Sequence, residues 1–296
     1  MTVNETTFDA GIRLDSLTHR YRGQDAPALG NVSLEIPSGS ITGIVGPNGS
    51  GKTTLMRILA GHMFETSGTV SFGGAPIATD DRIPWTALAQ AGEDFGENNI
   101  KEVVRTAAMR PTWDADLFAH LVERFRLEPL KGSAGKKSTG QKSMLTASIA
   151  MASGAPIVLF DEVHSGLDVP NRYAFYEELM SLGAEGDRTI LVSSHLVGEL
   201  ERLVEHLVIL EAGHARTTSV DAVRQSVHSL VGPAEAMEAA TEGMHVLTRR
   251  QLGPTAEFVV EGSIDEAATS RFLAAGIEVK PLSFQDAFVA IVEENR

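Results

Sequence analysis

The sequence predicts a mainly parallel α/β sheet followed by a smaller α+β domain. Apolar, β-branched segments alternate with helical patterns, which favours parallel strands joined by right-handed crossovers. A glycine-rich loop also lies between a strand and a helix, in the order that a phosphate-binding loop requires. For a chain of 296 residues we expect one large domain, residues 1–225, with a small companion, residues 226–296.

Four apolar segments are the predicted strands of the parallel sheet, and they span residues 40–45, 155–160, 189–195 and 207–210. Residues 12–43 alternate apolar and polar positions and indicate short antiparallel strands. A mostly helical pattern runs over residues 84–152 and predicts a helical subdomain at about residues 84–150. Its expected core positions are Val103, Val104, Leu117, Leu121, Val122 and Phe125.

The last seventy residues have a different pattern. The expected order is strand, helix, strand, strand, helix, strand, which is typical of a ferredoxin-like domain, and a final helix follows it. The predicted elements span residues 227–231, 233–241, 245–249, 257–260, 265–275, 277–282 and 283–294.

The glycine-rich loop carries the most specific chemistry. It begins after the strand at residues 40–45, reads Gly46-x-x-x-x-Gly51-Lys52-Thr53, and continues into a helix that ends before Gly61. Backbone N–H groups in such a loop converge on nucleotide phosphates, Lys52 adds a point charge and the Thr53 hydroxyl can bind Mg²⁺. The residues expected to bind ATP here are Gly46, Asn48, Gly49, Ser50, Gly51, Lys52, Thr53 and Thr54.

Two carboxylates follow the strand at residues 155–160. Ligands of open α/β sheets bind at the carboxyl ends of the strands, which is where Asp161 and Glu162 lie. Asp161 is expected to hold Mg²⁺, through water, and Glu162 to polarise the attacking water. An acidic pair on its own is more often a solvated loop, so this assignment depends on the phosphate loop that precedes it.

Composition excludes several classes of site. The chain has 25 Lys and Arg against 39 Asp and Glu, a net charge of −14, and a polynucleotide would need clustered basic residues. Cysteine is absent, so a disulfide, a thiol nucleophile or a thiolate metal site is impossible. No apolar run approaches the ~20 residues of a membrane helix. We therefore expect neither nucleic-acid binding nor a direct membrane span.

Residues 12–215 resemble the nucleotide-binding subunit of ATP-binding cassette (ABC) transporters. Besides the phosphate loop and Asp161-Glu162, the tetrapeptide Ser138-Thr139-Gly140-Gln141 resembles the signature sequence of that family, and a helical pattern follows it directly. Asp168, in Ser165-Gly166-Leu167-Asp168, resembles the D-loop aspartate.

Three single residues extend the resemblance. His195 ends the third strand, at the place of the switch histidine; Gln90 lies where the family has its Q-loop glutamine; and Tyr21 corresponds to the aromatic residue that stacks on adenine. Taken alone, His195 and Tyr21 would fit a hydrogen-bonded histidine and an aromatic residue on a strand face.

The resemblance implies a P-loop NTPase with a RecA-like sheet, an antiparallel β subdomain, a helical signature subdomain and Mg²⁺-dependent ATP hydrolysis. Its catalytic residues would be Glu162, His195, Lys52 and Gln90, and its metal contacts Thr53, Gln90 and Asp161. Further ATP contacts would come from Tyr21, Ser138, Thr139, Gly140, Gln141 and Asp168, with the signature residues facing ATP held by a second subunit.

The resemblance also implies partners and a location. They are a second nucleotide-binding subunit, with a homodimer favoured over a heterodimer, and a separate transmembrane permease that holds the chain on the cytoplasmic face of the membrane. The segment at residues 281–288, Pro-Leu-Ser-Phe-Gln-Asp-Ala-Phe, resembles the tails of bacterial exporter subunits and favours export.

Two alternatives remain. A soluble ABC-type ATPase without a channel is one, although translation members usually fuse two cassettes and DNA repair members insert coiled coils, features that this chain lacks. A phosphate-loop kinase is the other, but it explains neither residues 138–141 nor His195.

Three departures from the family pattern bear on turnover rate more than on ATP binding. Lys137 replaces a leucine, Thr139 replaces the first signature glycine, and Val163-His164 replaces a proline and a small hydroxyl residue. Because Glu162 and His195 are both present, we expect a competent hydrolase.

Overall fold

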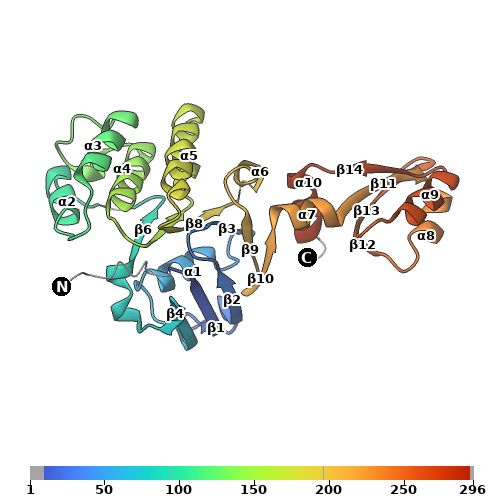
Figure 1. Ribbon diagram of the computed structural model, residues 1–296, viewed down its shortest axis with the longest axis horizontal. Helices are drawn as coiled ribbons and strands as arrows, with labels where there is room; N and C mark the ends of the chain where they lie inside the picture. Colours follow the sequence, from blue (N-terminus) through green and yellow to red (C-terminus); the bar gives the residue numbers. More distant parts are fainter. Residues whose placement is uncertain (1–9, 94, 196, 294–296) are drawn as a thin grey trace, which may run out of the picture. The chain divides into compact units, whose positions relative to one another are not determined.

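The computed structural model describes residues 10–93, 95–195 and 197–293 (Figure 1). The chain divides into two compact units, each with its own hydrophobic core. The first contains the residues up to 195 together with 206–217, and the second contains residues 197–205 and the chain from 218 onward. The sequence prediction divides the chain after residue 225 instead.

A six-stranded sheet forms the centre of the first unit, in the order β10-β9-β3-β8-β7-β6. Strand β3 pairs in parallel with β8 and β9, and β7 pairs in parallel with β6 and β8, so the prediction of a mainly parallel sheet is confirmed. The strands are β3 (Ile41–Val45), β6 (Thr86–Gln90), β7 (Ile157–Asp161), β8 (Thr189–Ser194), β9 (His206–Glu211) and β10 (His214–Ser219).

A second, antiparallel sheet has the order β2-β1-β4-β5. Its strands are β1 (Ile12–His19), β2 (Leu29–Ile36), β4 (Ser67–Phe72) and β5 (Ala75–Pro76). Helix α1 (Lys52–Leu59) connects the two sheets through one core, because its Leu55, Met56, Ile58 and Leu59 pack with apolar residues of both (Figure 1). This packing holds α1 against the sheet that contains β3, the strand that leads into the phosphate loop.

The helical part of the first unit begins later than the sequence predicts. Residues 86–90 form β6, the edge strand beside β7, and the expectation of helix there is wrong. The segment is rich in good helix formers, but pairing with β7 overrides that weak preference. The observed helices are α2 (Ile100–Ala107), α3 (Ala115–Arg124), α4 (Thr139–Ala152) and α5 (Val169–Ala184), and the 3₁₀ turns are η1 (Thr79–Asp81), η2 (Ile83–Trp85), η3 (Ala134–Lys136) and η4 (Val163–Gly166).

The expected core positions of this helical part divide into two groups. Leu121, Val122 and Phe125 are buried, as predicted. Leu117 and the pair Val103-Val104 are only half-buried. Helix α2 therefore contributes less to the core than its apolar pattern suggests.

The second unit contains a four-stranded antiparallel sheet with the order β12-β13-β11-β14. Along the chain the order is strand, helix, strand, strand, helix, strand, which confirms the ferredoxin-like prediction. The elements are β11 (Val227–Pro233), α8 (Ala234–Ala240), β12 (His245–Leu252), β13 (Thr255–Glu261), α9 (Glu266–Ala274) and β14 (Glu278–Pro281). Its core joins Met237 of α8 and Phe272 of α9 to Leu230, Phe258 and Val260 of the sheet.

Three further helices complete the second unit: α6 (Val197–Leu200), α7 (Val220–Ser226) and α10 (Phe284–Glu293). Helices α6 and α10 approach closely at Gly198, where an added Cβ would lie 2.7 Å from the Gln285 side-chain oxygen. The final predicted helix is observed, although residue 294 lies outside the described residues. None of the helices in the described part of the chain combines the length and apolarity that crossing a membrane requires.

A buried ion pair fixes the end of α1 in the first unit. The Arg82 side chain is fully buried and donates to both carboxylate oxygens of Glu65, at 2.8 and 3.0 Å. It also donates to the Ile58 and Ile77 carbonyls. Burial raises the pKa of Glu65, but the hydrogen bonds and the charge of Arg82 outweigh it and leave that pKa below its ordinary value of 4.5.

Glu65→Gln is expected to lower the free energy of unfolding by about 3 kcal/mol at pH 7, because it leaves the buried charge of Arg82 uncompensated. Since the pKa of Glu65 is lowered in the folded state, its contribution is present above the unfolded value and is lost as pH falls through the folded value. The variant should therefore lose less stability than wild type on acidification. Urea unfolding at pH 7 and in mild acid checks both.

Glu35→Gln is the matched control for this prediction. Glu35 forms an ion pair with Arg13 in which both side chains are more than 60% exposed. Exposed pairs contribute about 0–1 kcal/mol. Equal losses in the two variants would contradict the account of the buried pair.

Candidate functional site

The phosphate loop joins β3 to α1 at residues 46–51, and its two outer glycines are required by close approach. At Gly46, with φ +153°, an added Cβ would lie 2.1 Å from the Leu210 carbonyl oxygen. At Gly51, with φ +107°, it would lie 2.5 Å from the Ala28 carbonyl oxygen. Only glycine fits these two positions, so the spacing of the motif follows from the backbone.

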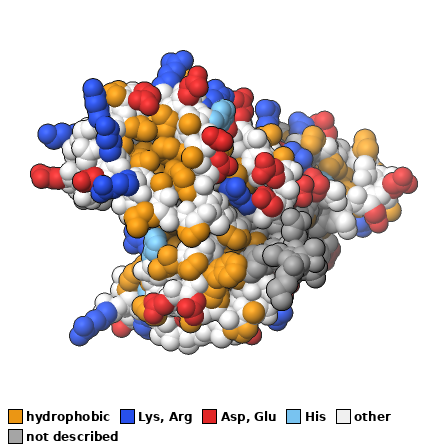
Figure 2. All heavy atoms as spheres, turned by 60° about the vertical axis from the view of Figure 1, so that its left-hand side comes forward, with side chains coloured by type: hydrophobic (Ala, Val, Ile, Leu, Met, Phe, Trp, Pro, Cys, Tyr) orange, Lys and Arg blue, Asp and Glu red, His pale blue; other side chains and the backbone are white. Residues whose placement is uncertain are grey.

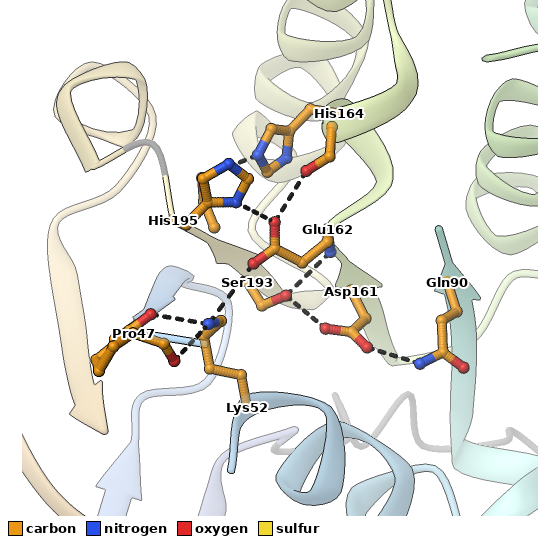
Figure 3. A network of polar contacts seen from close by, with 11 residues as sticks. Pro47, Lys52, Gln90, Asp161, Glu162, His164, Ser193 and His195 are labelled. Atoms are coloured by element: carbon orange, nitrogen blue, oxygen red, sulfur yellow. Dashed lines mark hydrogen bonds and ion pairs between the residues drawn. The ribbon is translucent and has the colours of Figure 1, made fainter. Parts of the chain in front are cut away.

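Polar groups converge inside the loop. Lys52 is 6% exposed, and its Nζ donates to the carbonyl oxygens of Gly46 at 2.8 Å and Pro47 at 3.2 Å. The same Nζ lies 3.6 Å from Glu162 Oε1 (Figure 3). Ser50 Oγ is buried and has no hydrogen-bond partner in the described structure. A positive charge, an orphaned hydroxyl and the N–H groups of the first turn of α1 together suit an anionic ligand such as a phosphate.

A cavity of about 620 Å³ opens beside the loop, within the size range of small-molecule sites. Tyr21 lines it, and the Tyr21 hydroxyl lies 3.0 Å from Thr54 Oγ1, while its ring packs edge-on against His19. The other lining residues are Gln24, Ala26, Pro27, Ala28, Asn48, Gly49, Gly51, Lys52, Thr53, Thr54, Glu162, Ala212 and Gly213. Most of the predicted ATP contacts of the loop, and Tyr21, therefore line a shared cavity, whereas Gly46 and Ser50 are not among its lining residues.

Asp161 ends β7 and Glu162 follows it directly, and Ser193 of β8 hydrogen-bonds to both of them. Asp161 is 2% exposed, and its Oδ1 accepts a hydrogen bond of 2.6 Å from Ser193 Oγ. The same Ser193 Oγ accepts from the backbone N–H of Glu162 at 3.0 Å. This arrangement follows from the parallel register, which places Asp161 beside Ser193.

Glu162 has a left-handed backbone, with φ +55°, which is uncommon outside glycine. Its Oε2 lies 2.6 Å from His195 Nδ1 and accepts from Ser165 Oγ at 2.9 Å (Figure 3). Burial raises the pKa of Glu162, but the hydrogen bonds from His195 and Ser165 and the charge of Lys52 outweigh it and leave the pKa lowered. Glu162 is therefore an ionised carboxylate at neutral pH.

Gln90 ends β6 and contacts Asp161 directly. Its Nε2 donates to Asp161 Oδ2 at 2.8 Å, and its Oε1 accepts from Arg57 at 3.0 Å. The opposite amide orientation would face an NH₂ group to a guanidinium and an oxygen to a carboxylate, so the two partners determine it. The predicted contact of Gln90 with a metal stays a prediction, and it requires Oε1 to leave Arg57.

The signature tetrapeptide does not line this cavity. Ser138 caps α4 by accepting from the N–H of Gln141, and the Gln141 side chain accepts from the N–H of Ser138. Thr139 lies against Gly166, where an added Cβ would be 3.1 Å from its methyl group. The substituted threonine is thus accommodated because residue 166 is glycine, and residues 138, 139 and 141 are exposed.

Asp168 also acts as a helix cap, accepting from the N–H of Asn171 at the start of α5. The structure therefore brings together Lys52, Asp161, Glu162, His195 and Gln90, and leaves residues 138–141 and Asp168 outside the cavity lining. The helix-cap contacts give Ser138, Gln141 and Asp168 a local structural role at the starts of α4 and α5. Their predicted contacts with ATP in a second subunit stay predictions.

Sequence reasoning missed four residues of this network: Arg57, Ser165, Ser193 and His164 as a contact of Ser194. Their signals were weak, because a serine at a strand end and an arginine on a helix are common. Ser193 alone had a usable signal, since it lies two residues before His195 and so shares its face of the strand.

Comparison with known proteins identifies the family. A family model described as "ABC transporter" matches residues 29–165. The "Taurine import ATP-binding protein TauB" of Chromobacterium violaceum is 31% identical over 218 residues, 70% of this chain and 81% of the relative. The chain belongs to the ABC transporter family. It is an ATP-binding subunit of that family.

Other relatives of this ABC subunit are covered over a smaller share of their length. The "Probable multidrug ABC transporter ATP-binding protein YbhF" of Escherichia coli is 30% identical over 252 residues, 82% of this chain and 43% of the relative. The "Nod factor export ATP-binding protein I" of Cupriavidus metallidurans is 32% identical over 197 residues, 64% of this chain and 65% of the relative. The chain thus spans less than two thirds of these two proteins.

Solved structures agree with the ABC fold. A structure of an ATP-binding subunit of an ABC transporter has a TM-score of 0.64 at 25% identity, covering 72% of this chain and 91% of that one. A bacterial Atm1-family ABC exporter with ATP bound has a TM-score of 0.64 at 20% identity, covering 76% of this chain and 41% of that one. The likeness to the exporter concerns the fold alone.

Proposed function

We propose that the chain hydrolyses ATP and powers transport through a separate transmembrane subunit. The single observation that carries the proposal is the cluster in which Lys52 and Glu162 line one cavity and His195 hydrogen-bonds to Glu162. Phosphoryl transfer to water depends on positioning and on neutralising charge. The loop N–H groups and Lys52 would bind the phosphates of ATP, and Glu162 would orient the water and take its proton.

The residues present fit a magnesium ion. Thr53, which carries a hydroxyl, lines the cavity, and Asp161 offers a buried carboxylate at the end of β7. These are the oxygen ligands that Mg²⁺ prefers. Thr53 and Asp161 would hold the ion, which when bound neutralises phosphate charge. His195 donates to Glu162, so this pair keeps the base ionised and oriented.

A second copy of the chain completes the site in this proposal. The start of α4 exposes residues 138, 139 and 141 at a helix N-terminus, which favours an anion. Since these residues do not line the cavity of their own chain, they would face ATP held by a partner. Hydrolysis would then require a dimer, with a homodimer as the assembly proposed.

Export is the proposed direction, supported by the resemblance of residues 281–288 to exporter tails and by the export relatives. The import protein among the relatives makes import the alternative direction.

A candidate docking surface lies on the helical part of the first unit. Figure 2 shows hydrophobic side chains gathered on one face of the part that holds α2–α4, and Met109, after α2, is 78% exposed. We propose that this helical part meets the permease, which would place the chain at the cytoplasmic membrane face.

Purification of the chain from detergent-solubilised membranes of its host tests the transporter proposal against a soluble ABC-type ATPase. The expected result is a stable complex with a multi-spanning membrane protein, and a loss of that complex in Met109→Asp. Met180→Asp, on α5, is the matched control, because Met180 is also exposed. A chain that stays in the soluble fraction when the neighbouring genes are co-expressed would contradict the proposal.

A further inference from the structure

His164 is a buried histidine beside the candidate base. It lies in η4, two residues after Glu162, with 0% of its surface exposed. Its Nε2 lies 2.9 Å from Ser194 Oγ, which is also fully buried. Burying an imidazole is unfavourable unless its polar atoms are hydrogen-bonded, so this contact is a built feature of the loop.

The last two residues of β8, Ser193 and Ser194, and His195 directly after the strand all contact the loop that carries Glu162. Ser193 bonds Asp161 and the Glu162 N–H, and His195 bonds the Glu162 carboxylate. Because side chains alternate along a strand, Ser194 points to the face opposite that of Ser193, and its hydroxyl contacts His164 Nε2 at 2.9 Å. The loop that carries Glu162 is thus held by hydrogen bonds from side chains on both faces of the end of β8.

We propose that His164 is a positioning residue that sets the geometry of the pair formed by Glu162 and His195. The contact between His164 and Ser194 acts on both members, since Ser194 precedes His195 directly and His164 follows Glu162 by two residues. The centroids of the His164 and His195 imidazole rings are 6.3 Å apart, so the two histidines are close neighbours. This proposal rests on the proposed ATP hydrolysis.

The backbone conformation of Glu162 explains why the contact between His164 and Ser194 is important for the position of Glu162. A left-handed conformation at a residue other than glycine persists only where the surroundings determine it. If the contact with Ser194 is lost, η4 can relax and Glu162 can move relative to His195. A displacement of about 1 Å in a reacting group costs about 100-fold in rate, so a partial loss of order should cost about 10-fold.

The phosphate loop and Tyr21 belong to other elements and do not contact His164 in any hydrogen bond described. ATP binding should therefore be preserved while turnover falls. This separates a positioning role from a structural one, because general destabilisation does not lower kcat of the folded protein alone.

Steady-state ATP hydrolysis by the full chain tests the proposal. His164→Ala is expected to lower kcat about 10-fold with KM for ATP within about two-fold of wild type. His164→Gln, which returns a polar atom near the position of Nε2, is expected to restore most of kcat. His62→Gln, at an exposed histidine, is the matched control, and Val70→Ala, in the core of the antiparallel sheet, controls for lost stability.

Ser194→Ala should reproduce the effect of His164→Ala, and the double variant should be no slower than either single one, because the two residues act as a unit. Three results would overturn the proposal: unchanged kcat in His164→Ala, an equal fall in Val70→Ala, or a folded His164→Gln that remains as slow as the alanine variant.

A measurement without turnover separates this proposal from the proposed function. Histidine ¹⁵N resonances report the hydrogen bond at His195 Nδ1 directly. His164→Ala is expected to change that signal, and His164→Gln to keep it. If wild type does not hydrolyse ATP, the proposed function fails while this readout still decides the role of His164: an unchanged His195 signal in the alanine variant would overturn it.

Discussion

Lys52→Ala is expected to weaken ATP binding by at least about 30-fold, since removing one partner from a buried, hydrogen-bonded charged group costs about 2–5 kcal/mol. Lys52 Nζ lies among the Gly46 and Pro47 carbonyls and Glu162, so it is already held where phosphate charge would be bound. Its removal takes away the one side-chain cation that the described cavity lining contains.

Calorimetric titration of the purified variant with Mg²⁺-ATP measures this loss. Lys101→Ala, at an exposed position on α2, is the matched control and should bind as wild type does. Thermal unfolding of both variants shows that the fold is retained. An affinity of Lys52→Ala within two-fold of wild type would mean that the loop does not bind the phosphates.

Glu162→Gln is expected to slow turnover by about 10²–10⁴-fold, the usual contribution of a positioned general base. The amide keeps the size of the side chain and its capacity to accept from Ser165, but it cannot take a proton from water. Because the lowered pKa keeps Glu162 ionised at neutral pH, wild type holds the competent form there. ATP should still bind, since Lys52 and the loop are unchanged.

Phosphate release and ATP binding, measured on the same preparation, separate these two effects. Glu185→Gln, at an exposed position just after α5, serves as the control and should turn over normally. Unchanged turnover in Glu162→Gln would remove the assigned base, and weakened binding without slower turnover would assign Glu162 to binding instead.

The phosphate loop could be predicted from sequence because its residues are contiguous and the strand before and the helix after have clear periodicities. The glycines at residues 46 and 51 also have positive φ values, +153° and +107°, which favour glycine locally, whereas their close approaches to Leu210 and Ala28 needed the tertiary structure. The fold of the second unit could also be predicted, because its alternation of strands and helices is compatible with few topologies. Its observed strand order is the ferredoxin-like one.

Other features depend on pairing that no local pattern records. Residues 86–90 carry helix formers, yet they pair with β7, and that pairing brings Gln90 to Asp161. Ser193 reaches Asp161 because of the register between β7 and β8. The contacts of Arg57 with Gln90 and of His164 with Ser194 arise because the tertiary structure places α1 and η4 beside these strand ends. These supporting contacts of the site could therefore not be predicted from the sequence.

The most direct measurement of the account is phosphate release from Mg²⁺-ATP by the purified wild-type chain as its concentration is raised. The account predicts release well above that of Glu162→Gln, with a rate per chain that increases with concentration as dimers form and residues 138–141 complete the partner site. Release no faster than that of Glu162→Gln would contradict hydrolysis at this site. A rate per chain that is independent of concentration, in protein shown to be monomeric, would contradict the shared site.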